Sequence, residues 1–204
     1  MTPFGPRLKY GPDGSRERTV RAVSFLTWSG AMSVTVSVRD ARAAESDRRW
    51  IQGVYRDYLD DLAPDTGVFP VLGEVGHEPE RLPMRWFGDP NAFPLVILKA
   101  AEPVGFAMVA RAAPSAAKSR VDYRMAEFFI IRTRRRLGIG ETAVQLILSR
   151  FAGRWEITEY LRNAGAVSFW RRVVAAYTCG RYQERIVNGE VRQVFESGRK
   201  RSPA

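Results

Sequence analysis

The spacing of apolar residues predicts regular secondary structure from about residue 34 onward. Val34, Val36 and Val38 alternate with polar residues, which is typical of a half-buried strand. A helix is then predicted to begin near Ser46 and Asp47, because the apolar residues that follow recur at intervals of three and four. They are Trp50, Ile51, Val54, Tyr55, Tyr58, Leu59 and Leu62.

A stretch rich in glycine and proline separates this helix from the next apolar runs. It extends from Pro64 to Pro94, contains one expected short helix near residues 81–87, and is long enough to have a function of its own. Two apolar runs then flank a short turn and predict a hairpin, with strands at residues 94–99 and 104–111.

The rest of the chain shows strand and helix patterns in turn. We predict a long strand at residues 121–131, a helix over 143–151, a strand at 155–160, a helix over 166–177, and strands at 182–187 and 190–195. Asn188 and Gly189 join the last two strands and indicate a tight hairpin, because both turn positions require a positive φ. This order predicts an α/β fold with a mixed sheet flanked by helices and no internal repeat.

Length and composition limit the chain to one globular domain with tails. It has 204 residues, of which 45% are hydrophobic and 26% charged, and no apolar run is long enough to cross a bilayer. We expect a disordered tail over residues 1–31, one domain over 32–197 and a basic tail over 198–204. A single histidine, His77, and a single cysteine, Cys179, argue against a zinc site and an internal disulfide and agree with a cytoplasmic location.

The net charge of +10 favours an anionic ligand: a nucleic acid, an anionic lipid or a phosphate-bearing cofactor. Many arginines gather in the segment from Arg132 to Arg136, and two more lie at Arg171 and Arg172. No RNP, KH or helix-turn-helix pattern accompanies them, so we expect cofactor phosphates rather than nucleic acid.

The segment from Arg132 to Gly140 lies between an apolar strand and an amphipathic helix. The free amides and the dipole of a helix N-terminus favour a phosphate there, and glycines let the backbone close around it. A Walker loop would need Lys and Ser or Thr after the last glycine, but Glu141 follows Gly140. A dinucleotide fingerprint over Gly138, Gly140 and Ala143, with Glu159 as the ribose acid, remains a minor alternative, although the loop starts late after its strand.

A third interpretation is the pattern R-x-x-G-x-G, matched by Arg135, Gly138 and Gly140. The strand at residues 126–131, this loop, its helix, the strand at 155–160 and the run Asn163-Ala164-Gly165-Ala166-Val167-Ser168-Phe169-Trp170 follow in the order found in GNAT N-acetyltransferases. The chain therefore resembles the GNAT superfamily, whose fold is a mixed sheet that is splayed at its centre.

The resemblance implies a cofactor, acetyl-CoA or coenzyme A. Its pyrophosphate would bind the backbone amides of the glycine loop, and its pantetheine arm would lie between the strands at residues 125–131 and 155–160, which the family splays. The residues that the resemblance assigns to cofactor binding are Phe128, Phe129, Ile130, Arg135, Arg136, Leu137, Gly138, Ile139, Gly140, Asn163 and Trp170. Asn163 is also expected to cap the last helix. No metal ligand is expected.

Catalysis would require a base for the attacking amine and an acid for the leaving thiolate. Glu127 is our candidate base, and the alternatives are Glu159, Glu74, Glu78 and Glu80. Many family members carry a tyrosine seven residues after the asparagine as the acid. Trp170 occupies that position here and cannot donate a proton, so the acid stays unassigned; Tyr177 is expected to be a core residue.

The sequence thus predicts an acetyl-CoA-dependent N-acetyltransferase that acylates a primary amine by direct attack in a ternary complex. The amine, a small molecule or a protein, is not specified, and the oligomeric state is open, a homodimer included. Two alternatives remain: a non-catalytic acyl-CoA or nucleic-acid binding module on the same fold, and a dinucleotide-binding protein.

Overall fold

The computed structural model describes residues 35–66, 83–112 and 121–198. The predicted N-terminal tail and nearly all of the C-terminal one lie outside these residues, as do His77, Glu74, Glu78 and Glu80. The predicted strands and helices that fall within the described ranges are confirmed, including the short helix near residues 81–87, a π-helix named η3 (Pro83–Phe87).

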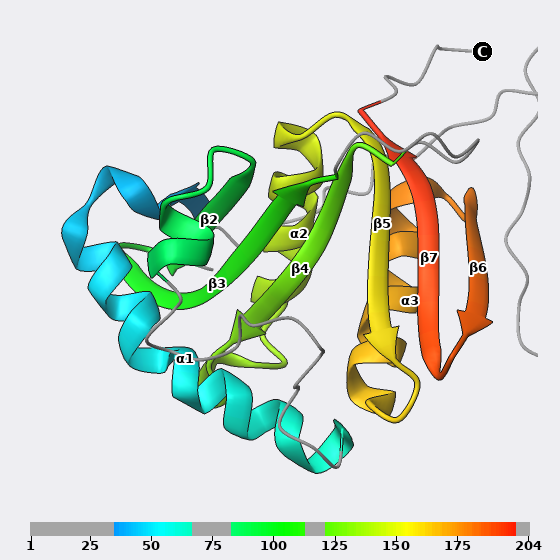
Figure 1. Cartoon of the computed structure of the whole chain (residues 1–204), viewed down its shortest axis with the longest axis horizontal. Coiled ribbons are helices and arrows are strands. Elements are labelled where there is room, and N and C mark those ends of the chain that lie inside the picture. The colour runs from blue at the N-terminus through cyan, green and yellow to red at the C-terminus, as the bar shows by residue number, and fades with distance from the viewer. Residues whose placement is uncertain (1–34, 67–82, 113–120, 199–204) are drawn as a thin grey trace, which may run out of the picture. The chain divides into compact units, whose positions relative to one another are not determined.

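The sheet has seven strands in the order β1-β2-β3-β4-β5-β7-β6 (Figure 1). The strands are β1 (Val36–Asp40), β2 (Ala92–Lys99), β3 (Glu102–Arg111), β4 (Tyr123–Ile130), β5 (Gly153–Tyr160), β6 (Tyr182–Val187) and β7 (Glu190–Ser197). Only β4 and β5 pair in parallel among these neighbours, and the other pairs are antiparallel. The expected mixed α/β sheet is therefore confirmed.

Within the described residues, three α-helices cover the sheet: α1 (Glu45–Thr66), α2 (Ile139–Arg150) and α3 (Ala164–Thr178). The helix α1 lies on one face, and α2 and α3 lie on the other (Figure 1). Short 3-10 segments, η1 (Ala41–Ala43) and η4 (Arg132–Arg134), precede α1 and α2.

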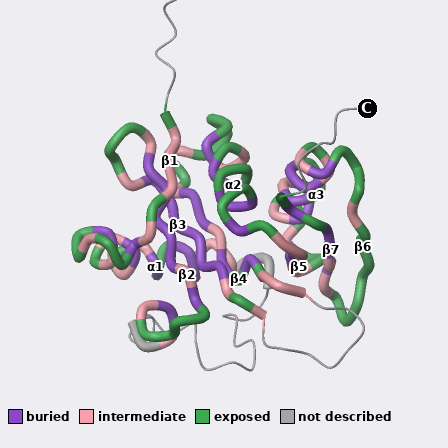
Figure 2. The backbone as a smooth tube through the Cα atoms, turned by 90° about the horizontal axis from the view of Figure 1, so that it is seen from above, coloured by how far each residue is buried: buried purple, intermediate pink, exposed green. Residues whose placement is uncertain are grey.

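Each face of the sheet has its own apolar core because side chains alternate along a strand. On the α1 face the buried residues include Ile51, Tyr55 and Phe106. On the α2 and α3 face they include Trp155 and other large side chains, among them Val144, Ile147, Leu148, Ile157, Val173 and Val174. Figure 2 shows buried residues concentrated in the central strands, whereas β6 at the edge is almost entirely exposed.

The hairpin predicted at Asn188 and Gly189 joins β6 to β7, and the two residues have φ values of 53° and 79°. Both lie in the left-handed region, as a two-residue hairpin turn requires. Tyr177 packs against the core on α3, as expected.

Candidate active site

The strands β4 and β5 are joined only at their beginnings. The parallel ladder consists of the pairs Tyr123–Trp155, Arg124–Glu156 and Met125–Ile157. Both strands continue beyond it, β4 to Ile130 and β5 to Tyr160, and their backbones separate toward their ends (Figure 1). We call this divergence beyond Met125 and Ile157 the splay. Its two inner edges carry backbone groups without a partner in the facing strand.

A β-bulge in β4 lies where the splay begins. Met108 of β3 pairs with Glu127 and Val109 pairs with Met125, so Ala126 is an extra residue in the ladder. Bulges bend a strand and increase its twist, which turns the end of β4 away from β5. The bulge also places Met125 and Glu127 on opposite faces of the sheet. Met125 packs in the core on the α2 and α3 face, whereas Glu127 contacts α1.

Glu127 is buried, with only 3% of its surface exposed. The hydroxyl of Tyr55 on α1 donates a hydrogen bond to Oε1 at 3.0 Å. Burial raises the pKa of Glu127 to about 8, although the Tyr55 hydroxyl, the charge of Arg85 and the Trp86 side chain each lower it. Burial, with the Glu127 charge added, likewise raises the pKa of Tyr55 far above its usual value. The carboxyl group is therefore suited to exchange a proton near neutral pH.

Glu159 is a second carboxyl group with a raised pKa. It lies on β5 two residues beyond the last pair with β4, and it is partly buried. Burial raises its pKa to about 8, and a hydrogen bond with the Trp170 side chain lowers it. On its other side, β5 stays paired with β7, where Val191 is opposite Glu159. The splay thus has a titratable carboxyl group on each of its strands.

The glycine loop ends at the N-terminus of α2. Arg136 and Gly138 both have left-handed backbone conformations, with φ values of 62° and 75°. The first helical hydrogen bond runs from the amide of Thr142 to the carbonyl of Gly138, so the amides before Thr142 are the group that an α-helix leaves without internal partners. Such a helix start binds anions.

Gly140 brings this helix close to aromatic side chains. A Cβ atom at Gly140 would lie 3.4 Å from ring atoms of Phe169 and 3.6 Å from Phe128. A methyl group fits there in ordinary contact, but a branched side chain would displace one of the rings. At Gly138, by contrast, the space is open and only the positive φ disfavours a side chain.

The arginines of the loop contact acidic residues in other elements. Arg132 and Arg135 both pair with Asp61 of α1, and Arg134 pairs with Glu102 at 2.9 Å. Arg135 also donates to the carbonyl of Ile130 at 2.7 Å. The side chain of Arg135 therefore fastens the loop to β4 and α1. Its guanidinium group is thus occupied by partners within the protein, so the loop would offer an anion its backbone amides rather than this side chain.

Asn163 caps α3, as expected. Its Oδ1 accepts a hydrogen bond from the amide of Ala166 at 2.9 Å. Trp170 is 3% exposed and lies behind the splay, where its ring is 5.3 Å from that of Phe128 and 5.1 Å from that of Phe169. Phe129 faces α1 and packs on Tyr58, whereas Ile130 packs with Ile139 on the opposite face. Leu137 in the loop is exposed.

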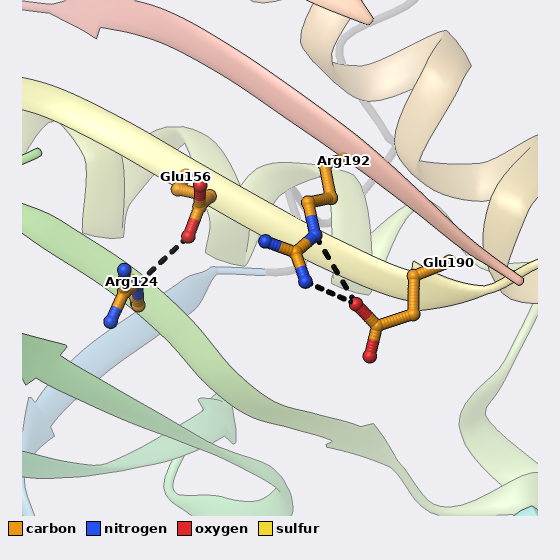
Figure 3. A network of polar contacts seen from close by, with 4 residues as sticks. All are labelled: Arg124, Glu156, Glu190 and Arg192. Carbon is orange, nitrogen blue, oxygen red and sulfur yellow. Dashed lines mark hydrogen bonds and ion pairs between the residues drawn. The ribbon is translucent and has the colours of Figure 1, made fainter. Parts of the chain in front are cut away.

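Two ion pairs lie on β4, β5 and β7 next to the splay (Figure 3). Arg124 donates to Glu156 at 2.8 Å across the parallel ladder, and Arg192 binds Glu190 at 2.7 Å on β7. In each pair one charge offsets the other, and pairs that are partly open to solvent, as these are, contribute little stability.

Asp61, Tyr55 and Tyr58 are site residues that the sequence analysis did not single out. Asp61 lies more than seventy residues before the arginines that it binds. In the sequence the two tyrosines are simply members of an apolar helix stripe. No local pattern indicates such contacts. They depend on how α1 packs against β4.

Among the described residues, no three histidine, cysteine or acidic side chains gather closely enough to hold a metal ion. Within the same ranges, none of the helices is both long and apolar enough to span a membrane.

The described residues thus form a mixed α/β sheet that splays between β4 and β5, with a glycine loop at the start of the adjoining helix α2. The family model described as Acetyltransferase (GNAT) family matches residues 51–174. The match covers more than half of the chain, so this chain belongs to the GNAT acetyltransferase family. No curated protein matches the sequence.

Solved structures show the same fold at low sequence identity. An acetyltransferase from Thermus thermophilus has a TM-score of 0.58 and 17% identity, with 80% of this chain and 97% of that one covered. The PaiA N-acetyltransferase of Thermoplasma acidophilum in complex with coenzyme A gives 0.55 and 10%, covering 79% and 99%. Spermidine N-acetyltransferase from Vibrio cholerae, in complex with CoA and spermine, gives 0.54 and 13%, covering 79% and 95%. The GNAT-like fold expected from the sequence is confirmed.

Proposed function

We propose that this protein is an acetyl-CoA-dependent N-acetyltransferase that acylates a primary amine by direct attack in a ternary complex. The observation that carries the proposal is the splay, because it stands beside the glycine loop at the start of α2. Membership of the acetyltransferase family and the CoA complexes of structural neighbours support it.

The residues present suit acetyl-CoA as the donor substrate. The pyrophosphate would meet the amides of the loop from Arg136 to Gly140, because the amide of Arg135 already donates to the carbonyl of Arg132. The pantetheine arm would pair with the edge of β4 beyond Met125. The carbonyl of Ile130 already accepts from Arg135, but a carbonyl oxygen can accept a second hydrogen bond. The Asn163 side chain would donate from the start of α3, since its Oδ1 serves in the cap.

Glu127 is the base in this proposal. It would accept the proton of the amine directly or through a water, and a base works best when its pKa lies near the working pH. Below pH 8 an increasing fraction of Glu127 is protonated and unable to accept, so the rate should rise with pH up to about 8.

A dinucleotide-binding protein is a weaker alternative. Such folds bind across a mostly parallel sheet, whereas only β4 and β5 are parallel within the described part of this one. The other alternative, a binding module without catalysis, differs from an enzyme only in turnover.

The first test is thermal stability with CoA. A ligand that binds only the folded protein at a hundredfold excess over its Kd stabilises it by about 2.7 kcal/mol. We expect acetyl-CoA and CoA to raise Tm. The variant Gly140→Val should lose most of this shift because its side chain displaces Phe169 or Phe128 beside the loop.

The matched control is Gly53→Val on α1, where a side chain meets open space and the CoA shift should persist. A wild-type Tm that responds to NAD but not to millimolar CoA would contradict the proposal. A panel of primary amines with labelled acetyl-CoA then separates an enzyme from a binding module, since the module would bind CoA without product.

A further inference from the structure

The proposed reaction leaves one step without a residue, which is the protonation of the thiolate. Trp170 occupies the position of the expected tyrosine, and an indole N–H can donate a hydrogen bond but does not release its proton. A side chain that supplies this proton would therefore be another titratable group at the splay.

Trp170 contacts one residue from each strand of the splay. Its ring packs against Phe128 of β4 at 5.3 Å, and its side chain lies close enough to Glu159 of β5 to lower the pKa of that carboxyl group. Trp155, Ile157 and Glu159 alternate along β5 and so share one face, which the first two bury against α2 and α3. Glu159 continues that row past the end of the β4–β5 ladder.

The other titratable groups around Glu159 are less suited to donate. Burial and the nearby Glu159 charge both raise the pKa of Tyr58 on α1 and of Tyr160 on β5 above the usual tyrosine value. A phenol with a raised pKa is a weaker acid. On β7, Glu190 and Arg192 are paired with each other. Burial, by contrast, keeps much of Glu159 protonated near neutral pH.

We propose that Glu159, oriented by Trp170, is the acid that protonates the leaving thiolate. This inference rests on the proposed function. The amine nitrogen forms its bond to the acetyl carbon as the carbon–sulfur bond breaks, and the sulfur keeps that bonding pair. The sulfur takes the proton of the Glu159 carboxyl group, and Glu127 takes the proton that the amine loses. The Trp170 N–H then stabilises the carboxylate left on Glu159, and both carboxyl groups return to equilibrium with water.

The activity test is Glu159→Gln with acetyl-CoA and an amine accepted in the panel. We expect kcat to fall by about 10²- to 10⁴-fold, as for the loss of a general acid, with little change in the KM for acetyl-CoA. The decline of kcat above pH 8, where Glu159 loses its proton, should disappear. Glu156→Gln removes a carboxyl group from the opposite face of β5 and should leave kcat unchanged.

Rescue separates a proton donor from a structural residue. Adding Trp170→Tyr to Glu159→Gln supplies a phenol in place of the lost carboxyl donor, and we expect kcat to recover at least about tenfold. If Glu159 had only a structural role, the added tyrosine would not raise kcat in that double variant. A Glu159→Gln enzyme with wild-type kcat and an unchanged alkaline decline would overturn the inference.

A binding measurement tests the inference without turnover. If Glu159 faces the sulfur, the affinity for CoA relative to desulfo-CoA should fall as the pH rises from about 8 toward 10, because Glu159 is then a carboxylate and repels the thiol of CoA as that thiol ionises. Glu159→Gln should remove this difference. Calorimetric titrations between pH 6 and 10 would show it. If CoA binds but its affinity relative to desulfo-CoA changes with pH identically in both proteins, Glu159 does not face the sulfur. If CoA does not bind at all, the proposed function itself fails.

Discussion

At the scale of single residues, the proposed reaction gives opposite duties to two acids, Glu127, which is buried, and Glu159, which is partly buried. Glu127 must be ionised to accept a proton, and Glu159 must be protonated to give one. With both pKa values at about 8, the productive combination is most populated at pH 8, at about a quarter of the molecules, and declines on each side. The pH profile of kcat/KM should therefore be bell-shaped.

We predict that Glu127→Gln lowers kcat by about 10²- to 10⁴-fold while the Kd for CoA hardly changes, because glutamine keeps the size and polarity but lacks a basic oxygen.

Tyr55→Phe removes the hydrogen bond that lowers the Glu127 pKa, so it should move the acidic limb of the profile to higher pH. Steady-state kinetics from pH 6 to 10 checks both. A loss confined to Tm, with normal kcat, would make Glu127 a structural residue.

Some of these candidate residues could be proposed from the sequence, and others could not. The loop glycines, Asn163 and Glu127 stand in recognisable order. The role of Arg135 could not be foreseen, because its partner Asp61 is distant in the chain and comes close only when α1 packs on the sheet. Trp170 could be recognised as a departure from the family pattern, but its contact with Glu159 required the structure.

At the scale of elements, β4 shows a structural feature that the apolar pattern of the sequence does not predict. Residues 121–131 predict one long strand, and β4 does form from Tyr123 to Ile130. Strict alternation would place Met125 and Glu127 on the same face, yet they lie on opposite faces because Ala126 is an extra residue. The apolar pattern therefore identifies the strand, while the bulge that positions the candidate base is not visible in it.

Deleting Ala126 should abolish CoA binding without unfolding the protein. The deletion leaves a regular strand in which Met125 and Glu127 keep their present faces, but it removes the bend that turns β4 from β5. We expect a cooperative thermal transition and no CoA-induced rise in Tm. Ala126→Ser, at an exposed position, should behave as wild type. If the deletion variant binds CoA normally, the bulge does not produce the splay.

At the scale of the whole molecule, the two raised pKa values make the fold depend on pH. Each carboxyl group has a pKa of about 8 in the folded protein against 4.5 as the ordinary value. The folded state therefore holds protons that the unfolded chain has released over this range. Their contribution to stability is complete below pH 4.5 and is lost as the pH rises through 8.

We predict that the free energy of unfolding of the wild type falls between pH 5 and 8 by up to about 1.4 kcal/mol per pH unit for each group, and levels off above. The double variant Glu127→Gln and Glu159→Gln should show a much flatter curve. Urea titrations at several pH values provide the measurement, and Glu196→Gln, at an exposed site, is the control. Parallel curves for the wild type and the double variant would show that the two acids are solvated.

The short ladder between β4 and β5 also has a consequence for how the chain folds. The hairpins β2–β3 and β6–β7 join neighbours in sequence, whereas the three β4–β5 pairs must close across η4 and α2. Contacts between distant residues form late because loop closure costs entropy. The β1–β2, β4–β5 and β5–β7 pairs all join strands that are distant in sequence, so they should form after the two hairpins, and until β4 meets β5 each of them presents an open strand edge to other chains. We therefore expect the short ladder that leaves these strand edges apart in the folded protein to make the newly synthesised chain prone to aggregate before β4 and β5 join.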